Sequence, residues 1–186
     1  MIITYLTQHK HNSGKTASGI LLSVCVWIAM TFQYRIYSTD SFVESLKKYN
    51  GTEYVWGGET RAGIDCSGLI RMGLRDAFLR NGRLGAALRV WLIDTAAWSI
   101  PVEYGDIFVL IGEFESVDST DCSKLPEGTV AVTADGVHTF AYLGKNMWIQ
   151  ASLNDKQVTI KNGKDRDPWF KVPVKIYKIR DAETKG

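Results

Sequence analysis

The fold depends first on the stretch Gly63-Ile64-Asp65-Cys66-Ser67-Gly68-Leu69-Ile70, where a polar loop gives way to a different pattern. After Cys66, apolar and small residues recur every three or four positions through Phe78, with Arg71 and Arg75 between them. This spacing is typical of an amphipathic helix whose apolar face is buried. The sequence therefore predicts a helix that begins at Cys66.

The segments on either side predict an α+β fold. Upstream, Phe42, Leu46 and Tyr49 fall on one face of a predicted helix that ends at Asn50-Gly51. Downstream of Pro126, turn residues separate five β-prone runs, at 129–133, 137–143, 147–152, 157–161 and 172–179. Helices followed by an antiparallel meander make an α+β domain.

The region 81–125 is the hardest to interpret. It holds glycines, an apolar patch, a β-prone run at 107–110 and an acidic loop at 113–121. We assign it no chemistry and expect it to be an insertion in a single domain that spans 36–186, because 186 residues bury one core comfortably but hardly two.

The N-terminal segment, 1–35, differs in composition from the rest. Lys10, His11 and Lys15 precede an uncharged stretch at 16–33, which is the layout of a signal anchor or signal peptide. A packed core helix is the alternative, since short apolar runs are ambiguous. Lipidation at Cys25 is disfavoured because Val24 precedes it. This layout predicts a location at the cell envelope or outside the cell, with membrane association through 16–33.

Charge and cysteine content exclude several classes of function. The net charge is +2 and Lys and Arg are spread over the chain, which disfavours nucleic acid as a partner but suits an anionic polymer such as a cell wall. Three cysteines do not form the even set of a disulfide scaffold. A zinc site at Cys66, Cys122 and His138 lacks the usual ligand spacing, so we expect neither metal nor cofactor.

Cys66 is the candidate nucleophile. At a helix N-terminus, unpaired N–H groups and the helix dipole are expected to lower the pKa of its thiol. Gly63, Ser67 and Gly68 are expected to leave room for a substrate carbonyl and its oxyanion donors. The alternative is a buried, inert cysteine, which is common for this residue type.

His138 and Gln150 are the candidate partners of Cys66. His138 is the only histidine beyond residue 11, so it is the one imidazole available as a base, although a packed histidine is the alternative. If Gly144-Lys145-Asn146 is a three-residue hairpin loop, Gln150 is a diagonal neighbour of His138 on the same face of the sheet, with roughly 7–8 Å between their Cα atoms. Its amide oxygen could then accept the imidazole N–H, whereas a two-residue loop would place it on the opposite face.

Several blocks together resemble the NlpC-type cell-wall peptidases. They are Tyr54-Val55-Trp56-Gly57-Gly58, the Asp65-Cys66-Ser67-Gly68 block, Leu125-Pro126-Glu127-Gly128-Thr129, and Gly136-Val137-His138 followed by Trp148-Ile149-Gln150. The resemblance implies a papain-like fold with Cys66 as nucleophile, His138 as base and Gln150 as the orienting residue. It also implies that Tyr54 and Asp65 line the substrate pocket, and we expect Ser67 and Trp56 beside them.

By this resemblance the chain would be a cysteine endopeptidase that cleaves peptidoglycan stem peptides between D-glutamate and a diamino acid, through a thioester and without a cofactor. Gln150 departs from the family, which most often has His at the third position. Two alternatives stay open. One is an amidase of the same fold that acts on another amide, as in toxin-like or phage-associated relatives; the other is a non-catalytic wall-binding domain.

Overall fold

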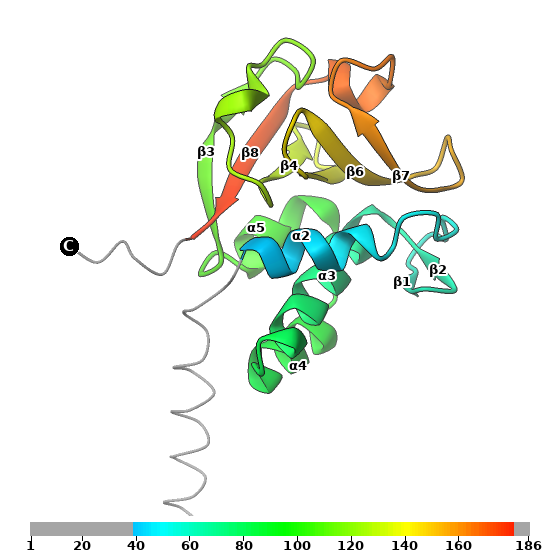
Figure 1. Ribbon diagram of the computed structural model, residues 1–186, viewed down its shortest axis with the longest axis vertical. Coiled ribbons are helices and arrows are strands. Elements are labelled where there is room, and N and C mark those ends of the chain that lie inside the picture. Colours follow the sequence, from blue (N-terminus) through cyan, green and yellow to red (C-terminus); the bar gives the residue numbers. More distant parts are fainter. Residues whose placement is uncertain (1–38, 181–186) are drawn as a thin grey trace, which may run out of the picture. The chain divides into compact units, whose positions relative to one another are not determined.

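The computed structural model describes residues 39–180 (Figure 1), so the predictions for 1–35 lie outside the described residues. The described chain contains a six-stranded antiparallel sheet, a small two-stranded sheet and α-helices gathered on one face of the larger sheet (Figure 1). The α+β prediction is confirmed. Between residues 39 and 180, no helix has the length and apolar character needed to cross a membrane.

Two of the helices in the structure, α2 and α3, were predicted from the sequence. The predicted N-terminal helix is α2, and the helix that begins at Cys66 is confirmed as α3. Their bounds and those of the other helical segments are α2 Thr39–Lys47, α3 Cys66–Arg80, α4 Leu84–Leu92, η2 Ala97–Ser99, α5 Ile100–Glu103, η3 Cys122–Lys124 and η4 Pro168–Lys171.

The large sheet has the strand order β3-β8-β4-β5-β6-β7. The bounds of its strands are β3 Phe108–Phe114, β4 Val130–Thr133, β5 Thr139–Tyr142, β6 Met147–Ser152, β7 Gln157–Asn162 and β8 Val174–Ile179. The predicted meander is correct from β4 to β7, but β8 does not extend it: β8 lies between β3 and β4. The β-prone run at 107–110 is part of β3, which continues to Phe114.

Helices α2 and α3 pack closely against one another because α3 has a glycine, Gly73, at their contact. A Cβ at Gly73 of α3 would lie 2.6 Å from Leu46 Cδ2 and 3.0 Å from Phe42 Cε2 of α2. Phe42 and Leu46 are fully buried, as the periodicity predicts. Since α3 also packs against β5 and β6, the start of α3 is held against the sheet.

Arg71 departs from the amphipathic pattern. It is fully buried although charged residues of α3 are expected to face solvent. Its guanidinium donates to Glu59 of β1 (Glu59–Thr60), to Asp94 and to the Val90 carbonyl. A buried arginine needs such partners. This cluster connects the loop before Cys66, with β1 and β2 (Gly63–Ile64), to α3 and to the end of α4.

Candidate active site

Asp65 fixes the start of α3 and the loop before it. Its Oδ1 accepts from the backbone N–H of Gly68 at 2.7 Å and from the Ser67 hydroxyl at 2.9 Å, which is a helix N-cap. Its Oδ2 accepts from the Gly57 N–H at 2.8 Å. Both carboxylate oxygens are therefore engaged by the protein, and they hold Cys66 at the first position of the helix.

The glycines around Cys66 serve backbone packing. A Cβ at Gly63 would lie 2.4 Å from Val55 Cγ2, and one at Gly58 would lie 2.6 Å from the Gly63 carbonyl oxygen. That Gly63 and Gly68 leave room for a substrate stays a prediction, and the structure gives a second reason for small residues here. Small residues are needed here because the loop 55–63 lies directly against the first turn of α3.

Gly68→Ala is expected to destabilise the domain by about 1–3 kcal/mol, the usual cost of overpacking. The added Cβ would lie 2.2 Å from the Gly58 carbonyl oxygen and 3.2 Å from Asp65 Oδ1, so backbone must move. Urea unfolding followed by circular dichroism measures the change. In the control Gly112→Ala the nearest atom is 3.4 Å away, and an equal loss there would contradict the local cause.

The Cys66 sulfur lies beside the residues that flank His138. Cys66 Sγ is 3.9 Å from the Val137 carbonyl oxygen. The backbone N–H groups of Thr139, Ser67 and Cys66 are hydrogen-bond donors to the sulfur and lower its pKa. Cys66 is only 9% exposed. Burial, and to a lesser extent the Asp65 carboxylate, raises the pKa of the Cys66 thiol to about 11, against the smaller lowering by these N–H groups. The expectation of a lowered pKa is wrong, because desolvation outweighs the helix terminus.

His138 is held by a tight turn and by an aromatic ring. Thr133 closes the turn, with its N–H bonded to the His138 carbonyl at 3.0 Å and its Oγ1 accepting from the His138 N–H at 3.0 Å. The imidazole is stacked on Trp169, with 4.4 Å between ring centroids. Burial lowers the pKa of His138 to about 4, against a smaller upward effect of Gln150. The resting pair is thus a neutral thiol and a neutral imidazole.

Alkylation of Cys66 by iodoacetamide is expected to speed up about tenfold per pH unit from pH 7 to pH 10, because only the thiolate reacts and the thiol pKa is about 11. Mass spectrometry of the peptide that contains Cys66 gives the rate without interference from Cys25 and Cys122. A rate that is flat from pH 5 to pH 9 would instead reveal a thiolate–imidazolium pair and contradict the neutral resting state.

Gln150 reaches His138 as the hairpin register predicts. Leu143 and Met147 close the loop, and β5 and β6 pair Tyr142 with Trp148, so Phe140 is opposite Gln150. His138 Nε2 and Gln150 Oε1 are 2.7 Å apart, and Gln150 is fully buried. The predicted three-residue loop and the predicted contact are both confirmed.

The predicted substrate-binding residues lie at different distances from this chemistry. Burial, and to a lesser extent the charges of Cys66 and Asp65, raises the pKa of the Tyr54 phenol to about 12, which places its hydroxyl in their electrostatic neighbourhood. The Ser67 hydroxyl is used by Asp65. Trp56 is 82% exposed, so its ring projects into solvent. Substrate binding by Tyr54, Asp65, Ser67 and Trp56 stays a prediction.

Three residues of the site were not found from the sequence. Asp167 accepts from Gln150 Nε2 at 2.7 Å and from Lys161 Nζ at 2.8 Å, and Trp169 covers His138. The only local signal is Asp167-Pro168-Trp169, because Asp followed by Pro is typical of a helix start and Asp167 caps η4. That signal predicts a cap but no contact with Gln150.

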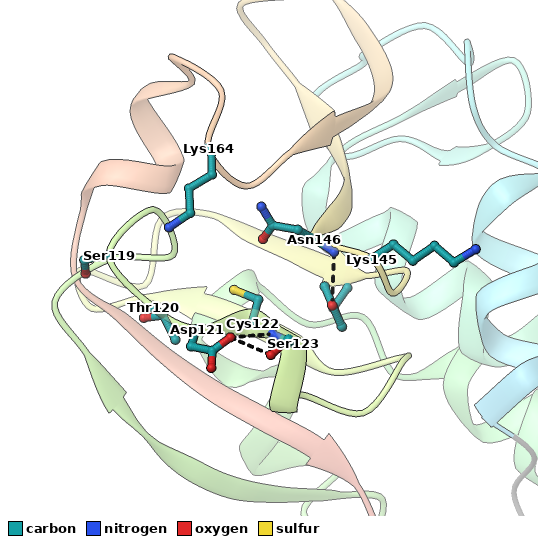
Figure 2. Close-up of a pocket in the computed structure, with 9 residues that line it drawn as sticks. Ser119, Thr120, Asp121, Cys122, Ser123, Lys145, Asn146 and Lys164 are labelled. Carbon is teal, nitrogen blue, oxygen red and sulfur yellow. Dashed lines mark hydrogen bonds between the residues drawn. The ribbon is translucent and has the colours of Figure 1, made fainter.

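A hollow lies around Cys122 (Figure 2). It is lined by residues 119–123, Tyr142, Lys145, Asn146 and Lys164. Cys122 packs with Phe140 and Trp148 in the core of the sheet, and its thiol donates to the Val117 carbonyl. Within residues 39–180, no group of three or more His, Cys, Asp or Glu side chains is placed to hold a metal ion.

Comparison with known proteins gives a coherent group of relatives. Dipeptidyl-peptidase 6 of Lysinibacillus sphaericus is 24% identical over 141 residues, and the match covers 71% of this chain and 39% of that protein. The chain thus spans about two fifths of the length of this curated relative. NlpC2 from Trichomonas vaginalis has a TM-score of 0.50 and 19% identity, covering 76% of this chain and 46% of that one.

The peptidoglycan hydrolase RipB from Mycobacterium tuberculosis has a TM-score of 0.47 and 18% identity, covering 74% of this chain and 63% of that one. The likeness to NlpC2 is one of fold, in line with the papain-like architecture that the sequence blocks imply. The family model described as the NlpC/P60 family matches residues 51–175, more than half of the chain, and spans Cys66, His138 and Gln150. The chain therefore belongs to the NlpC/P60 family.

Proposed function

We propose that this chain is a cysteine endopeptidase that hydrolyses an amide bond in peptidoglycan stem peptides, the bond between D-glutamate and a diamino acid. The observation that carries the proposal is the 2.7 Å contact between His138 Nε2 and Gln150 Oε1, beside a cysteine at a helix N-terminus. This contact leaves Nδ1 of the imidazole as the nitrogen available to the thiol. Membership of the NlpC/P60 family supports the choice of a cell-wall substrate.

The mechanism follows from the neutral resting pair. His138 Nδ1 takes the proton of the Cys66 thiol as the sulfur attacks the amide carbon, so charge separates only when substrate is present. The N–H groups of Cys66 and Ser67, which lie beside the sulfur at the start of α3, would donate to the oxyanion. The imidazolium then gives its proton to the leaving amine, a thioester forms on Cys66, and water that His138 activates hydrolyses the thioester.

Burial of both groups suits this order of events. A charged thiolate and imidazolium would each lose hydration in the resting site, since His138 is 4% exposed and Cys66 is 9% exposed. Once formed together they attract one another at short range, which offsets part of that cost. We further propose that the enzyme acts at the bacterial cell envelope or outside the cell, where its substrate is found.

Mass spectrometry of purified sacculi digested with the protein tests the proposal. We expect the release of fragments cut after D-glutamate. Fragments cut at another amide would contradict the proposed bond and identify the one that is hydrolysed. A protein that leaves sacculi intact but is labelled at Cys66 by an acylating probe would favour an amidase for a different substrate. A protein that binds sacculi and is not labelled would favour a wall-binding domain.

A further inference from the structure

Gln150 is itself held by a buried acidic residue. Its Nε2 donates to Asp167 Oδ2 at 2.7 Å, and the same oxygen accepts from Lys161 Nζ at 2.8 Å. The Asp167 side chain is only 2% exposed. Its other oxygen, Oδ1, accepts from the Trp169 N–H at 3.0 Å. Asp167 therefore has a protein donor on each oxygen, and two donors on the oxygen that faces Gln150.

This arrangement decides which way the Gln150 amide points. A carboxylate paired with an ammonium group is an acceptor only, so the amide NH2 must face Asp167 and the amide oxygen must face His138. The reversed amide would bring two acceptors together in a buried place, at a cost of about 1–3 kcal/mol or more. The orientation of Gln150 thus follows from its second partner.

The amide orientation in turn decides the tautomer of His138. An amide oxygen only accepts, so Nε2 of the imidazole must carry the hydrogen and Nδ1 keeps its lone pair. The reversed amide would donate to Nε2 and leave the hydrogen on Nδ1. A His138 of that kind has no lone pair at Nδ1 with which to take a proton from Cys66.

We propose that Asp167 is a positioning residue that locks the Gln150 amide and, through it, holds His138 in the Nε2–H tautomer. The proposal rests on the proposed function for its catalytic meaning, but the tautomer itself is independent of any substrate. Asp167 acts through a second route as well: it caps η4, the short helix that carries Trp169, whose ring is stacked on the imidazole. One carboxylate thus fixes both the hydrogen bond and the packing of His138.

Nitrogen-15 NMR of the imidazole tests the proposal on the wild-type protein first. The signals of His138 are those lost in His138→Gln, and they are expected to show hydrogen on Nε2 at neutral pH. Hydrogen on Nδ1 in the wild type would overturn the proposal without any variant of Asp167. A protein that shows the expected tautomer but does not digest sacculi would reject the proposed substrate and leave the role of Asp167 standing.

Asp167→Asn is the informative variant, because Asn keeps the size and an oxygen for the Trp169 N–H but can also donate to Gln150. We expect a mixture of the two tautomers and a loss of about 10-fold to 100-fold in kcat, with little change in KM. Asp165→Asn is the matched control: Asp165 is exposed in the same loop and accepts from the Asn162 N–H. It is expected to change neither the tautomer nor kcat.

A double-mutant cycle with Gln150→Leu separates positioning from general destabilisation. If Asp167 acts through Gln150, Asp167→Asn causes little further loss of kcat once Gln150 is replaced. Full additivity of the two effects, or an unchanged tautomer in a folded Asp167→Asn protein, would overturn the proposal.

Discussion

Cys66→Ala is expected to abolish the release of stem-peptide fragments from purified sacculi, with a loss of about a thousandfold or more in rate. The reason is that Ala cannot form the thioester, and removing a nucleophile removes the whole covalent route. The measurement is the mass-spectrometric yield of fragments over time with equal amounts of wild-type and variant protein.

The fold of Cys66→Ala should be nearly unchanged, which makes the result easy to interpret. The hydrogen bond of its thiol is a weak one to the Val137 carbonyl at 3.9 Å, so the free energy of unfolding should fall by roughly 1 kcal/mol or less. Cys122→Ala is the matched control, since that thiol is also buried but lies in the hollow of Figure 2. Wild-type cleavage by Cys66→Ala would reject the thiol mechanism.

The part of the site that could be predicted is the part that local pattern determines. The helix at Cys66 was predicted from its apolar spacing, which is a local feature, whereas its Asp65 cap was found only in the structure. Gln150 could be placed because side chains alternate along a strand and a three-residue loop fixes the register. The backbone at Gly144, Lys145 and Asn146 has positive φ, as this compact loop requires.

The remaining features depend on contacts between distant segments. β8 pairs with β4 although forty residues, 134–173, lie between them, and no turn signal between β7 and β8 specifies that pairing. The shift in the pKa of Cys66 was predicted in the wrong direction because burial of the sulfur depends on β5, which is distant from Cys66 in the sequence. Asp167 was not found because only the tertiary structure brings η4 to the end of β6.

Gln150→Leu is expected to lower kcat by about 100-fold with KM nearly unchanged. Leu is similar in size but cannot accept the Nε2–H of His138, so the imidazole loses its fixed tautomer and orientation. Because Gln150 is fully buried, it is not expected to contact the substrate, which is why the effect should appear in kcat. Initial rates on sacculi or on a soluble stem peptide measure both constants.

Gln157→Leu on the neighbouring strand is the matched control, because Gln157 is exposed at the start of β7 and should leave both constants unchanged. The variant Gln150→Leu also leaves Asp167 with one donor fewer on Oδ2, so part of its cost is stability rather than rate. Urea unfolding separates the two: a folded variant with a normal kcat would show that His138 needs no orienting partner. A folded variant with a low kcat would establish Gln150 as that partner, in the position where the family most often has His.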